Sequence, residues 1–366
     1  MRNTFGNVLT VTLFGESHGP ETGCVLDGLP AGFAVDEELL QADMAKRQGL
    51  PELSTARREA DEVRIVSGLY NGRTTGTPLT ILIANRNVRR GDYEELADKP
   101  RPSHADYTQF VRYEGYADRS GGGHFSARLT APLTAAGSLL KQMLAAQGIR
   151  VGTHVLSLGD LSDRRFDALA PEISELSGKN PPVLDDAVMA EMKAAVAAAK
   201  AAGDSLGGTL ETAVCGLPAG VGEPFFDTVE GHLAKAMFAI PGVKGIAFGA
   251  GFDFAGMKGS TANDPFVNID GAIRTETNHS GGINGGLTNG MPVLFRTVYR
   301  PTPSIARPQK TITLSDGTET TLTIQGRHDP AVVLRAAVIQ DAMTCLVIGD
   351  LLASLYGVNW LEKINR

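Results

Sequence analysis

The sequence predicts a mixed α+β fold that contains an internal duplication. Three observations lead to this prediction: short β-branched and apolar runs typical of strands, longer segments with one apolar face typical of helices, and a set of motifs that occurs twice in the same order. The chain of 366 residues is long enough for one large domain or two smaller ones.

The first part of the chain is predicted to place strands on either side of a capped helix. Residues 8–14, 20–32 and 78–83 are expected to form strands, the second of them followed by a turn. Asp36 has the position of a helix N-cap, with Val35 and Leu40 as a hydrophobic staple. The helix that it begins is expected to end at Gly49.

Three further helices and a hairpin are predicted in the rest of the chain. The helices are residues 133–147, residues 186–202 and a long helix that reaches about Leu355. Asp329 is expected to cap the long helix, with Pro330 at its first position. Residues 311–324 favour a hairpin that turns at Asp316-Gly317, and residues 158–182 are expected to form the longest loop.

The duplication is seen in three pairs of motifs. Glu16-Ser17-His18-Gly19 precedes Gly28-Leu29-Pro30-Ala31-Gly32, just as Asp204-Ser205-Leu206-Gly207 precedes Gly216-Leu217-Pro218-Ala219-Gly220. Thr74-Thr75-Gly76-Thr77-Pro78 is matched further on by Thr288-Asn289-Gly290-Met291-Pro292. Only the first copy has a histidine, since His18 corresponds to Leu206. The halves, at about residues 5–150 and 195–355, are therefore expected to share structure while one supplies acid–base chemistry.

Composition excludes several functional classes. The formal net charge of −7 argues against a nucleic-acid or membrane-surface partner. The three cysteines, Cys24, Cys215 and Cys345, are too few and too widely spaced for a disulfide framework, which indicates a reducing cytoplasm. We expect no signal peptide and no apolar stretch long enough to span a bilayer. No metal site is expected, because neither Cys–x–x–Cys nor His–x–x–x–His spacing occurs.

Histidines and arginines gather in loop motifs. Five of the seven histidines lie in loops that contain Gly or Pro: His18, His104, His124, His279 and His328. They indicate one polar site that transfers protons, whereas His154 and His232 are interpreted as structural. Seven arginines lie near the same kinds of loop: Arg47, Arg57, Arg58, Arg101, Arg128, Arg300 and Arg327. Together they predict a positive pocket for carboxylates or phosphates.

Two other interpretations remain to be weighed. Gly15-Glu16-Ser17-His18-Gly19 fits the nucleophile elbow of α/β hydrolases, with Ser17 as nucleophile and His279 or His328 as base. An elbow needs a helix directly after it, whereas a strand and turn are expected here. A non-catalytic protein that binds an anionic ligand is a further class. The Gly-rich segments 121–128 and 281–286 fit neither a Walker loop nor a dinucleotide fingerprint.

Taken together, the loop motifs resemble those of the chorismate synthase family. They follow the family's order from residue 5 to about residue 355. The segments that carry the resemblance are Phe14-Gly15-Glu16-Ser17-His18-Gly19, Lys46-Arg47-Gln48-Gly49, Thr74-Thr75-Gly76-Thr77-Pro78, Arg101-Pro102-Ser103-His104-Ala105-Asp106-Tyr107, Gly122-Gly123-His124-Phe125-Ser126-Ala127-Arg128, Gly203-Asp204-Ser205-Leu206-Gly207-Gly208, Val243-Lys244-Gly245, Asn278-His279-Ser280-Gly281-Gly282, Arg300-Pro301-Thr302-Pro303-Ser304 and Gly326-Arg327-His328-Asp329-Pro330.

The resemblance implies a fold, a reaction and a cofactor. It implies one domain over residues 1–366, a β-α-β sandwich with helices packed between antiparallel sheets. The implied reaction converts 5-enolpyruvylshikimate 3-phosphate to chorismate by loss of phosphate and a ring proton. Reduced flavin mononucleotide (FMN) is required but not consumed, and the protein is expected to be a homotetramer. Because no dinucleotide fingerprint is present, we expect an external reductant for the flavin rather than an intrinsic NADPH-dependent activity.

The resemblance also implies residue roles. His18 and His104 would transfer protons, and Asp329 would lie beside flavin N5 and help to remove the ring proton. The substrate's phosphate and carboxylates would be bound by Arg47, Arg101, Arg128 and Arg327. Flavin contacts would come from His124, Phe125, Ser126, Pro241, Gly242, Gly285, Arg300, Pro301, Thr302, Pro303, Ser304 and Arg327.

The chain departs from the family pattern at several positions. His124-Phe125-Ser126 stands where the family usually has Arg-Ser-Ser, and Leu129 where it usually has Glu. Ser103 replaces the usual Gly before the second histidine. The loop after Arg47 is short and lacks the second arginine that many members have there.

Overall fold

Two antiparallel sheets of five strands enclose the central helices of the protein. The computed structural model describes residues 3–48, 61–86, 98–118, 120–324 and 329–364. The first sheet has the order β1 (Thr4–Phe5), β2 (Thr10–Gly15), β3 (Glu21–Asp27), β7 (Leu79–Ala84) and β4 (Val63–Ser67). The second has the order β11 (Val243–Phe248), β16 (Val293–Tyr299), β10 (Gly208–Cys215), β8 (Arg150–Leu158) and β9 (Leu161–Ser162).

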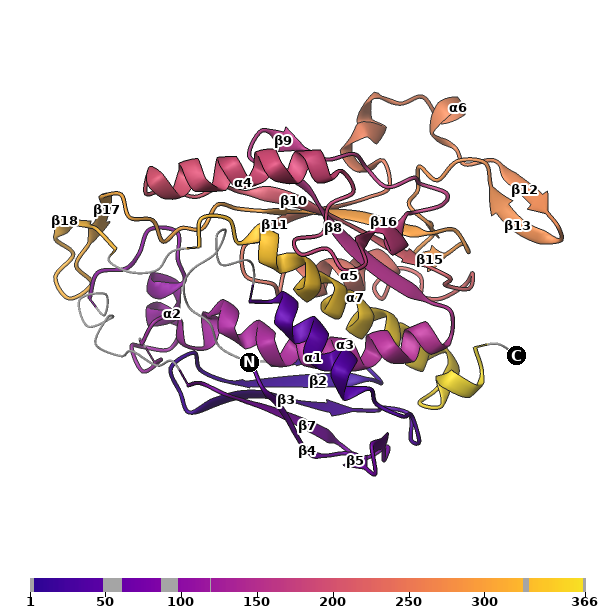
Figure 1. Cartoon of the computed structure of the whole chain (residues 1–366), viewed down its shortest axis with the longest axis horizontal. Helices are drawn as coiled ribbons and strands as arrows, with labels where there is room; N and C mark the ends of the chain where they lie inside the picture. The colour runs from indigo at the N-terminus through magenta and orange to yellow at the C-terminus, as the bar shows by residue number, and fades with distance from the viewer. Residues whose placement is uncertain (1–2, 49–60, 87–97, 119, 325–328, 365–366) are drawn as a thin grey trace.

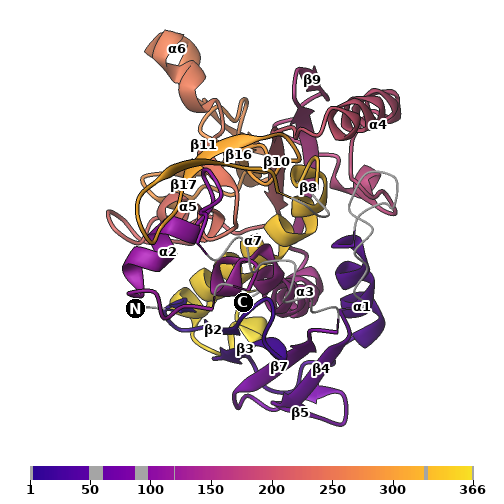
Figure 2. The same ribbon diagram turned by 90° about the vertical axis from the view of Figure 1, so that its left-hand side faces the viewer.

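The helices α3 (Thr130–Ala146) and α7 (Val333–Tyr356) lie side by side between the sheets (Figure 1). Both are buried on almost every face, because a sheet covers each side. Gly137 lets their backbones approach, since a Cβ atom there would lie 2.4 Å from the Cα of Ala342. The predicted α+β sandwich is therefore confirmed, and Figure 2 shows its layers from the end.

The remaining elements lie around this sandwich. The helix α1 (Glu37–Lys46) packs on α3, and α5 (Val229–Met237) packs on α7. The helix α4 (Asp186–Ala201) covers the outside and buries only Met192 and Val196. Smaller elements are α2 (Asp106–Arg112), α6 (Gly259–Ala262) and the strand pairs β5 (Leu69–Tyr70) with β6 (Arg73–Thr74), β12 (Phe266–Ile269) with β13 (Ala272–Thr275), β14 (Ile283–Asn284) with β15 (Leu287–Thr288), and β17 (Gln309–Ile312) with β18 (Glu319–Leu322).

The repeated motifs fold in the same way in both halves. The strand order β2-β3-β7-β4 of the first sheet is matched by β8-β10-β16-β11 in the second. The Thr74 hydroxyl donates to the Pro30 carbonyl at 2.6 Å, and the Thr288 hydroxyl donates to the Pro218 carbonyl at 2.6 Å. In each copy the same hydroxyl accepts a backbone N–H at 3.0 Å, from Phe33 or Val221. The sequence repeat thus corresponds to a repeated structural unit.

Most predicted elements are present with shifted ends. The strands predicted at 8–14 and 78–83 are β2 and β7, and the helices predicted at 133–147 and 186–202 are α3 and α4. Asp36 caps α1 as predicted, accepting the N–H groups of Glu38 and Leu39 at 3.0 Å. The predicted end of that helix at Gly49 lies outside the described residues. The hairpin around Asp316 is β17 with β18, and the loop at 158–182 contains only β9 and a short 3-10 helix, Ile173–Leu176.

The prediction that Asp329 caps the long helix is wrong. The helix α7 begins at Val333, and its N-cap position is Val332. The Asp329 carboxylate instead accepts the Ala331 N–H at 3.2 Å and pairs with Arg335 at 3.0 Å. The N–H groups of Leu334 and Arg335 donate to the carbonyls of Ala331 and Val332 in the first turn of the helix. Asp329 lies four residues before Val333 and is therefore too early in the chain to cap α7.

The expectation that no apolar stretch is long enough to span a bilayer is also wrong. The helix α7 has 24 residues and contains an 18-residue window with a mean hydropathy of 1.6, so its length and composition suffice. However, 94% of that apolar window is buried inside the protein, between the two sheets. The apolar character of α7 is accounted for by its central place in the core.

Candidate active site

One large cavity, of about 660 Å³, opens at the end of the sandwich where loops of both halves meet. Thirteen of the predicted site residues line it: His18, Arg101, His104, His124, Phe125, Ser126, Pro241, Gly242, Arg300, Pro301, Thr302, Pro303 and Ser304. They come from the β2–β3 connection, the segment before α2, the Gly-rich segment before α3, the α5–β11 connection and the segment after β16. Cavities of this volume are typical of small-molecule and cofactor sites.

His104 is held in this cavity by a charged network. Its Nδ1 lies 2.7 Å from Asp106 Oδ1 and 3.1 Å from Arg101 Nη2. Asp106 also accepts the Nε–H of Arg101 at 2.8 Å and the backbone N–H of Arg101 at 2.9 Å. Burial alone would raise the pKa of the Asp106 carboxyl, but the hydrogen bonds from Arg101 and His104 outweigh it and hold that pKa well below its usual range. Asp106 is therefore a carboxylate at neutral pH.

His18 is held by its neighbour and by the Gly-rich segment. The Ser17 hydroxyl lies 2.9 Å from His18 Nδ1, and the Ser17 N–H donates to the Gly123 carbonyl at 3.1 Å. A Cβ atom at Gly121 would lie 2.6 Å from His18 Cε1, and Gly121 has a φ of +73°. The glycine is needed here because its backbone contacts the imidazole and adopts the left-handed region. Ser17 is followed by β3 rather than a helix, which excludes the nucleophile elbow.

The departures at His124 and Phe125 both affect the cavity wall. His124 Nδ1 lies 2.8 Å from the Gly15 carbonyl, which can only accept, so this nitrogen carries the proton. Phe125 is 39% exposed and makes an edge-to-face contact with Tyr113, with 6.1 Å between the ring centroids. The segment therefore presents an imidazole and an aromatic ring, with no guanidinium at these positions.

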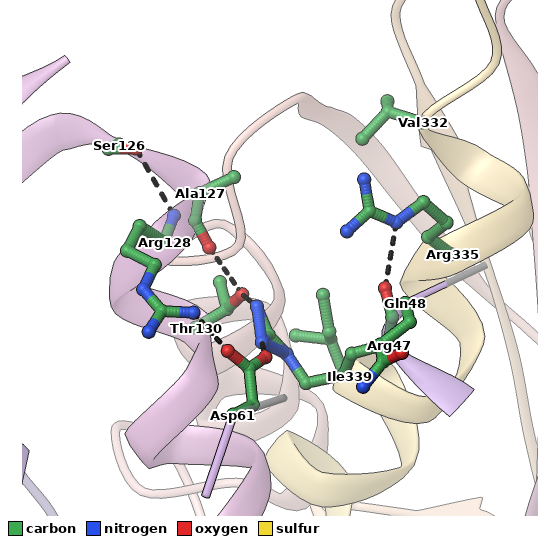
Figure 3. A pocket seen from close by; sticks show the side chains of 10 residues that line it. All are labelled: Arg47, Gln48, Asp61, Ser126, Ala127, Arg128, Thr130, Val332, Arg335 and Ile339. Carbon is green, nitrogen blue, oxygen red and sulfur yellow. Dashed lines mark hydrogen bonds and ion pairs between the residues drawn. The ribbon is translucent and has the colours of Figure 1, made fainter. Parts of the chain in front are cut away.

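A second, smaller cavity of about 220 Å³ adjoins the first and is rich in arginine (Figure 3). Ser126, Ala127, Thr130 and Val332 line both cavities. Arg47 Nη1 donates to Asp61 Oδ2 at 2.8 Å, and Arg128 Nη1 donates to the other oxygen of Asp61. Arg335 Nε donates to the backbone carbonyl of Arg47 at 2.7 Å. Three guanidinium groups line this cavity with one carboxylate, and Arg335 also pairs with Asp329 just outside the lining. The remaining positive charge suits the cavity to anionic groups.

The other predicted site residues lie elsewhere. Asp329 pairs with Arg335 at the edge of the arginine-rich cavity. Gly285 lies in the turn between β14 and β15 and is not among the residues that line either cavity. His279 pairs with Asp264 at 3.2 Å, also outside both. Arg57, Arg58, Arg327 and His328 lie outside the described residues.

Sequence reasoning missed three residues that the structure brings to the site. Asp61 holds two guanidinium groups, and Asp106 holds the Arg101 guanidinium and the His104 imidazole. Arg335 links Asp329 to the segment of Arg47. Asp106 could have been found from its position two residues after His104. Arg335 lies inside a helix, away from the Gly- and Pro-bearing loops that directed the search.

A histidine-lined cavity that adjoins an arginine-rich one, where loops of both halves meet, has the features of an enzyme active site. The family model described as chorismate synthase matches residues 9–353. The chain therefore belongs to the chorismate synthase family.

Individual relatives agree with this assignment. The chain is 44% identical to the chorismate synthase of Thermococcus gammatolerans over 345 residues, which cover 94% of this chain and 96% of that protein. It is 45% identical to the chorismate synthase of Methanocella arvoryzae over 354 residues, covering 96% and 94%. A solved structure described as the crystal structure of chorismate synthase superposes with a TM-score of 0.74 at 26% identity, covering 99% of this chain and 96% of that one.

Proposed function

We propose that this enzyme eliminates phosphate from 5-enolpyruvylshikimate 3-phosphate by a 1,4-anti elimination to give chorismate, the last step of the shikimate pathway. The observation that carries this proposal is the junction of the two cavities. The substrate has two carboxylates and a phosphate, which the arginines of the smaller cavity can bind. Its reaction also needs a nearby group that donates or accepts protons, and the histidines of the large cavity can do so.

The large cavity has properties that fit reduced FMN. Its volume of about 660 Å³ is adequate for a flavin nucleotide. Phe125, Pro301 and Pro303 offer flat apolar surfaces, and Lys244 and Arg300 offer cations for the phosphate group. The buried hydroxyl of Thr302 has no hydrogen-bond partner among the described residues, as expected where a ligand supplies one. Bound reduced flavin would supply electron density beside the substrate ring.

The chain's own residues would act in three ways. Arg47 and Arg128 bind the anionic groups, and neutralising the phosphate makes it a better leaving group. His104 and His18 hold or move a proton next to the flavin site. Asp329 accepts the ring proton, and Arg335 keeps its carboxylate at the edge of the arginine-rich cavity.

Two further proposals concern partners. We propose a homotetramer, as the family resemblance implies. Association of subunits is supported by Phe225, Phe226 and Phe252, which are 89%, 95% and 87% exposed. We also propose that a separate reductant supplies the reduced flavin.

The decisive experiment measures phosphate release from 5-enolpyruvylshikimate 3-phosphate under anaerobic conditions, with and without reduced FMN. We expect release only with reduced FMN. A hydrolase would release phosphate without flavin, and a binding protein would release none. Steady turnover in air with oxidised FMN and NADPH would contradict the proposed external reductant.

A further inference from the structure

A carboxylate that has no role so far lies directly behind one of the cavity histidines. Asp106 is the first residue of α2, and its Oδ1 lies 2.7 Å from His104 Nδ1. We propose that Asp106 is a positioning residue that fixes the tautomer and orientation of His104, so that Nε2 of His104 exchanges protons in the large cavity. This inference rests on the proposed function of that cavity.

The backbone around Asp106 is built to hold this pair. The N–H of His104 donates to the Arg101 carbonyl at 3.1 Å, which closes a tight turn just before α2. Ser103 adopts a φ of +61° within this turn. Asp106 then accepts three hydrogen bonds from Arg101, from its backbone N–H, its Nε–H and its Nη2, at 2.7–2.9 Å. The carboxylate is therefore fixed before it meets the imidazole.

Charge decides the tautomer. The hydrogen bonds of Arg101 and His104 hold the pKa of the Asp106 carboxyl below its usual range, against the effect of burial. An ionised carboxylate can only accept hydrogen bonds and a guanidinium can only donate them. His104 Nδ1 lies nearer to Asp106 Oδ1, at 2.7 Å, than to Arg101 Nη2, at 3.1 Å, and this shorter contact makes Nδ1 the donor. In the neutral imidazole Nε2 is then without a proton and can accept one. Asp106 also stabilises the imidazolium that forms, as the aspartate does in Ser-His-Asp triads.

A purely structural role for Asp106 makes a different prediction, and Asn separates the two. The Asp106→Asn side chain keeps the size of Asp and can still accept from Arg101. Its amide, however, can donate to His104 Nδ1, which favours the tautomer with the proton on Nε2. A structural role depends on shape and would survive this change, whereas a tautomer-fixing role would not.

The test combines a spectroscopic and a kinetic measurement on the full-length protein. The ¹⁵N shifts of the His104 ring should report a proton on Nδ1 in the wild type and a shift of population toward Nε2–H in Asp106→Asn. We expect kcat for phosphate release to fall by about 10²–10⁴-fold while KM changes little. In a His104→Ala background the same substitution should have little further effect, because the two residues act as a unit.

A matched control lies in a second Asp–His pair. Asp227 Oδ1 lies 3.1 Å from His232 Nε2, and neither residue lines the two cavities. Asp227→Asn should leave turnover unchanged.

Two results would overturn the inference: an unchanged Nδ1–H tautomer in Asp106→Asn, or an equal loss of kcat in the presence and absence of His104. The second result would show that Asp106 acts only by holding Arg101 in place and has no effect through His104. If wild-type protein releases no phosphate with reduced FMN, the proposed function fails, while the ¹⁵N measurement still tests the Asp106–His104 arrangement.

Discussion

The two halves of the molecule share a strand order and a set of hydrogen bonds, yet they contribute differently to the site. In the first half Ser17 precedes β3, and its hydroxyl lies 2.9 Å from Nδ1 of His18 in the large cavity. At the corresponding place before β10, the Ser205 hydroxyl donates to the Thr302 carbonyl at 2.7 Å. The first copy thus presents a histidine, and the second supports the segment that forms the opposite wall. The two copies thus share a local structure, while the residues that face the large cavity differ between them.

A histidine on a strand of the second sheet has a structural role instead. His154 of β8 is buried and lies 3.3 Å from Asp163 and 3.1 Å from Glu211. Burial alone would lower its pKa, but the hydrogen bonds to Asp163 and Glu211 outweigh burial and raise it. This histidine binds two carboxylates together inside the fold, whereas His18 and His104 face the cavity.

The largest expected effect is a difference in the rate of phosphate release between alanine variants at the corresponding positions His18 and Leu206. His18→Ala should lower the rate of phosphate release by about 10²–10⁴-fold, as loss of an acid–base group does, and His104→Ala should behave similarly. Binding of oxidised FMN, followed by fluorescence, should change little. Leu206→Ala should cost up to about 2 kcal/mol of unfolding free energy and leave turnover intact, because this partly buried side chain only packs. Equal kinetic losses at both positions would remove the proposed asymmetry.

The next effect concerns Asp329, which precedes α7 in the second half. Asp329→Asn should lower turnover by about 10²-fold or more, because an amide cannot accept the ring proton. Since Asp329 does not cap α7, the change in unfolding free energy should stay within about 1 kcal/mol, the range of a partly exposed ion pair. Normal turnover with an unchanged melting temperature would show that the ring proton leaves by another route.

A smaller effect is expected at Gly121, which contacts His18. In Gly121→Ala the added methyl group would displace the imidazole, and we expect about a tenfold loss of rate, in addition to about 1–2 kcal/mol of backbone strain. Gly148 is the matched control, because it has a φ of +77° but a Cβ atom there would meet nothing within 4 Å. Gly148→Ala should show similar strain in urea unfolding and no loss of rate. A rate loss of similar size in both variants would attribute the effect to backbone strain alone.

The two threonines of the repeat test whether the halves are equivalent in stability. Thr74→Val and Thr288→Val each leave a backbone N–H and a carbonyl without their hydroxyl partner. Each should cost about 1–3 kcal/mol of unfolding free energy and leave turnover unchanged. The contribution of one hydrogen bond to stability varies by up to about threefold with its surroundings. If the losses in unfolding free energy of the two variants differ by more than that, the two units are not equally stable.

These comparisons show which parts of the site could be predicted from the sequence. Loop histidines and arginines could be found because Gly and Pro mark where the chain leaves its strands. Asp61 was missed because its pairing with Arg47 and Arg128 depends on how separate segments meet. Asp106 lies within five residues of both its partners, Arg101 and His104, and could have been found from the sequence. The Asp-Pro pattern at residue 329 suits both a cap and the turn that precedes a helix, so sequence alone could not separate them.

The smallest expected effect concerns Ser103, a residue of the first half whose backbone carbonyl is hydrogen-bonded to Arg300 of the second half. The φ of Ser103, +61°, lies in the left-handed region, which is unfavourable for a residue with a Cβ atom and which glycine adopts freely. Ser103→Gly relieves that strain but adds about 0.5–1 kcal/mol of backbone entropy to the unfolded chain, so the net change in stability should stay below about 1 kcal/mol. The Ser103 carbonyl accepts Nη1 of Arg300 at 2.8 Å, and this contact between the halves survives the substitution because it uses the backbone. Turnover should therefore be unchanged. A loss of rate in Ser103→Gly, with stability maintained, would show instead that the serine side chain acts in the cavity that it lines.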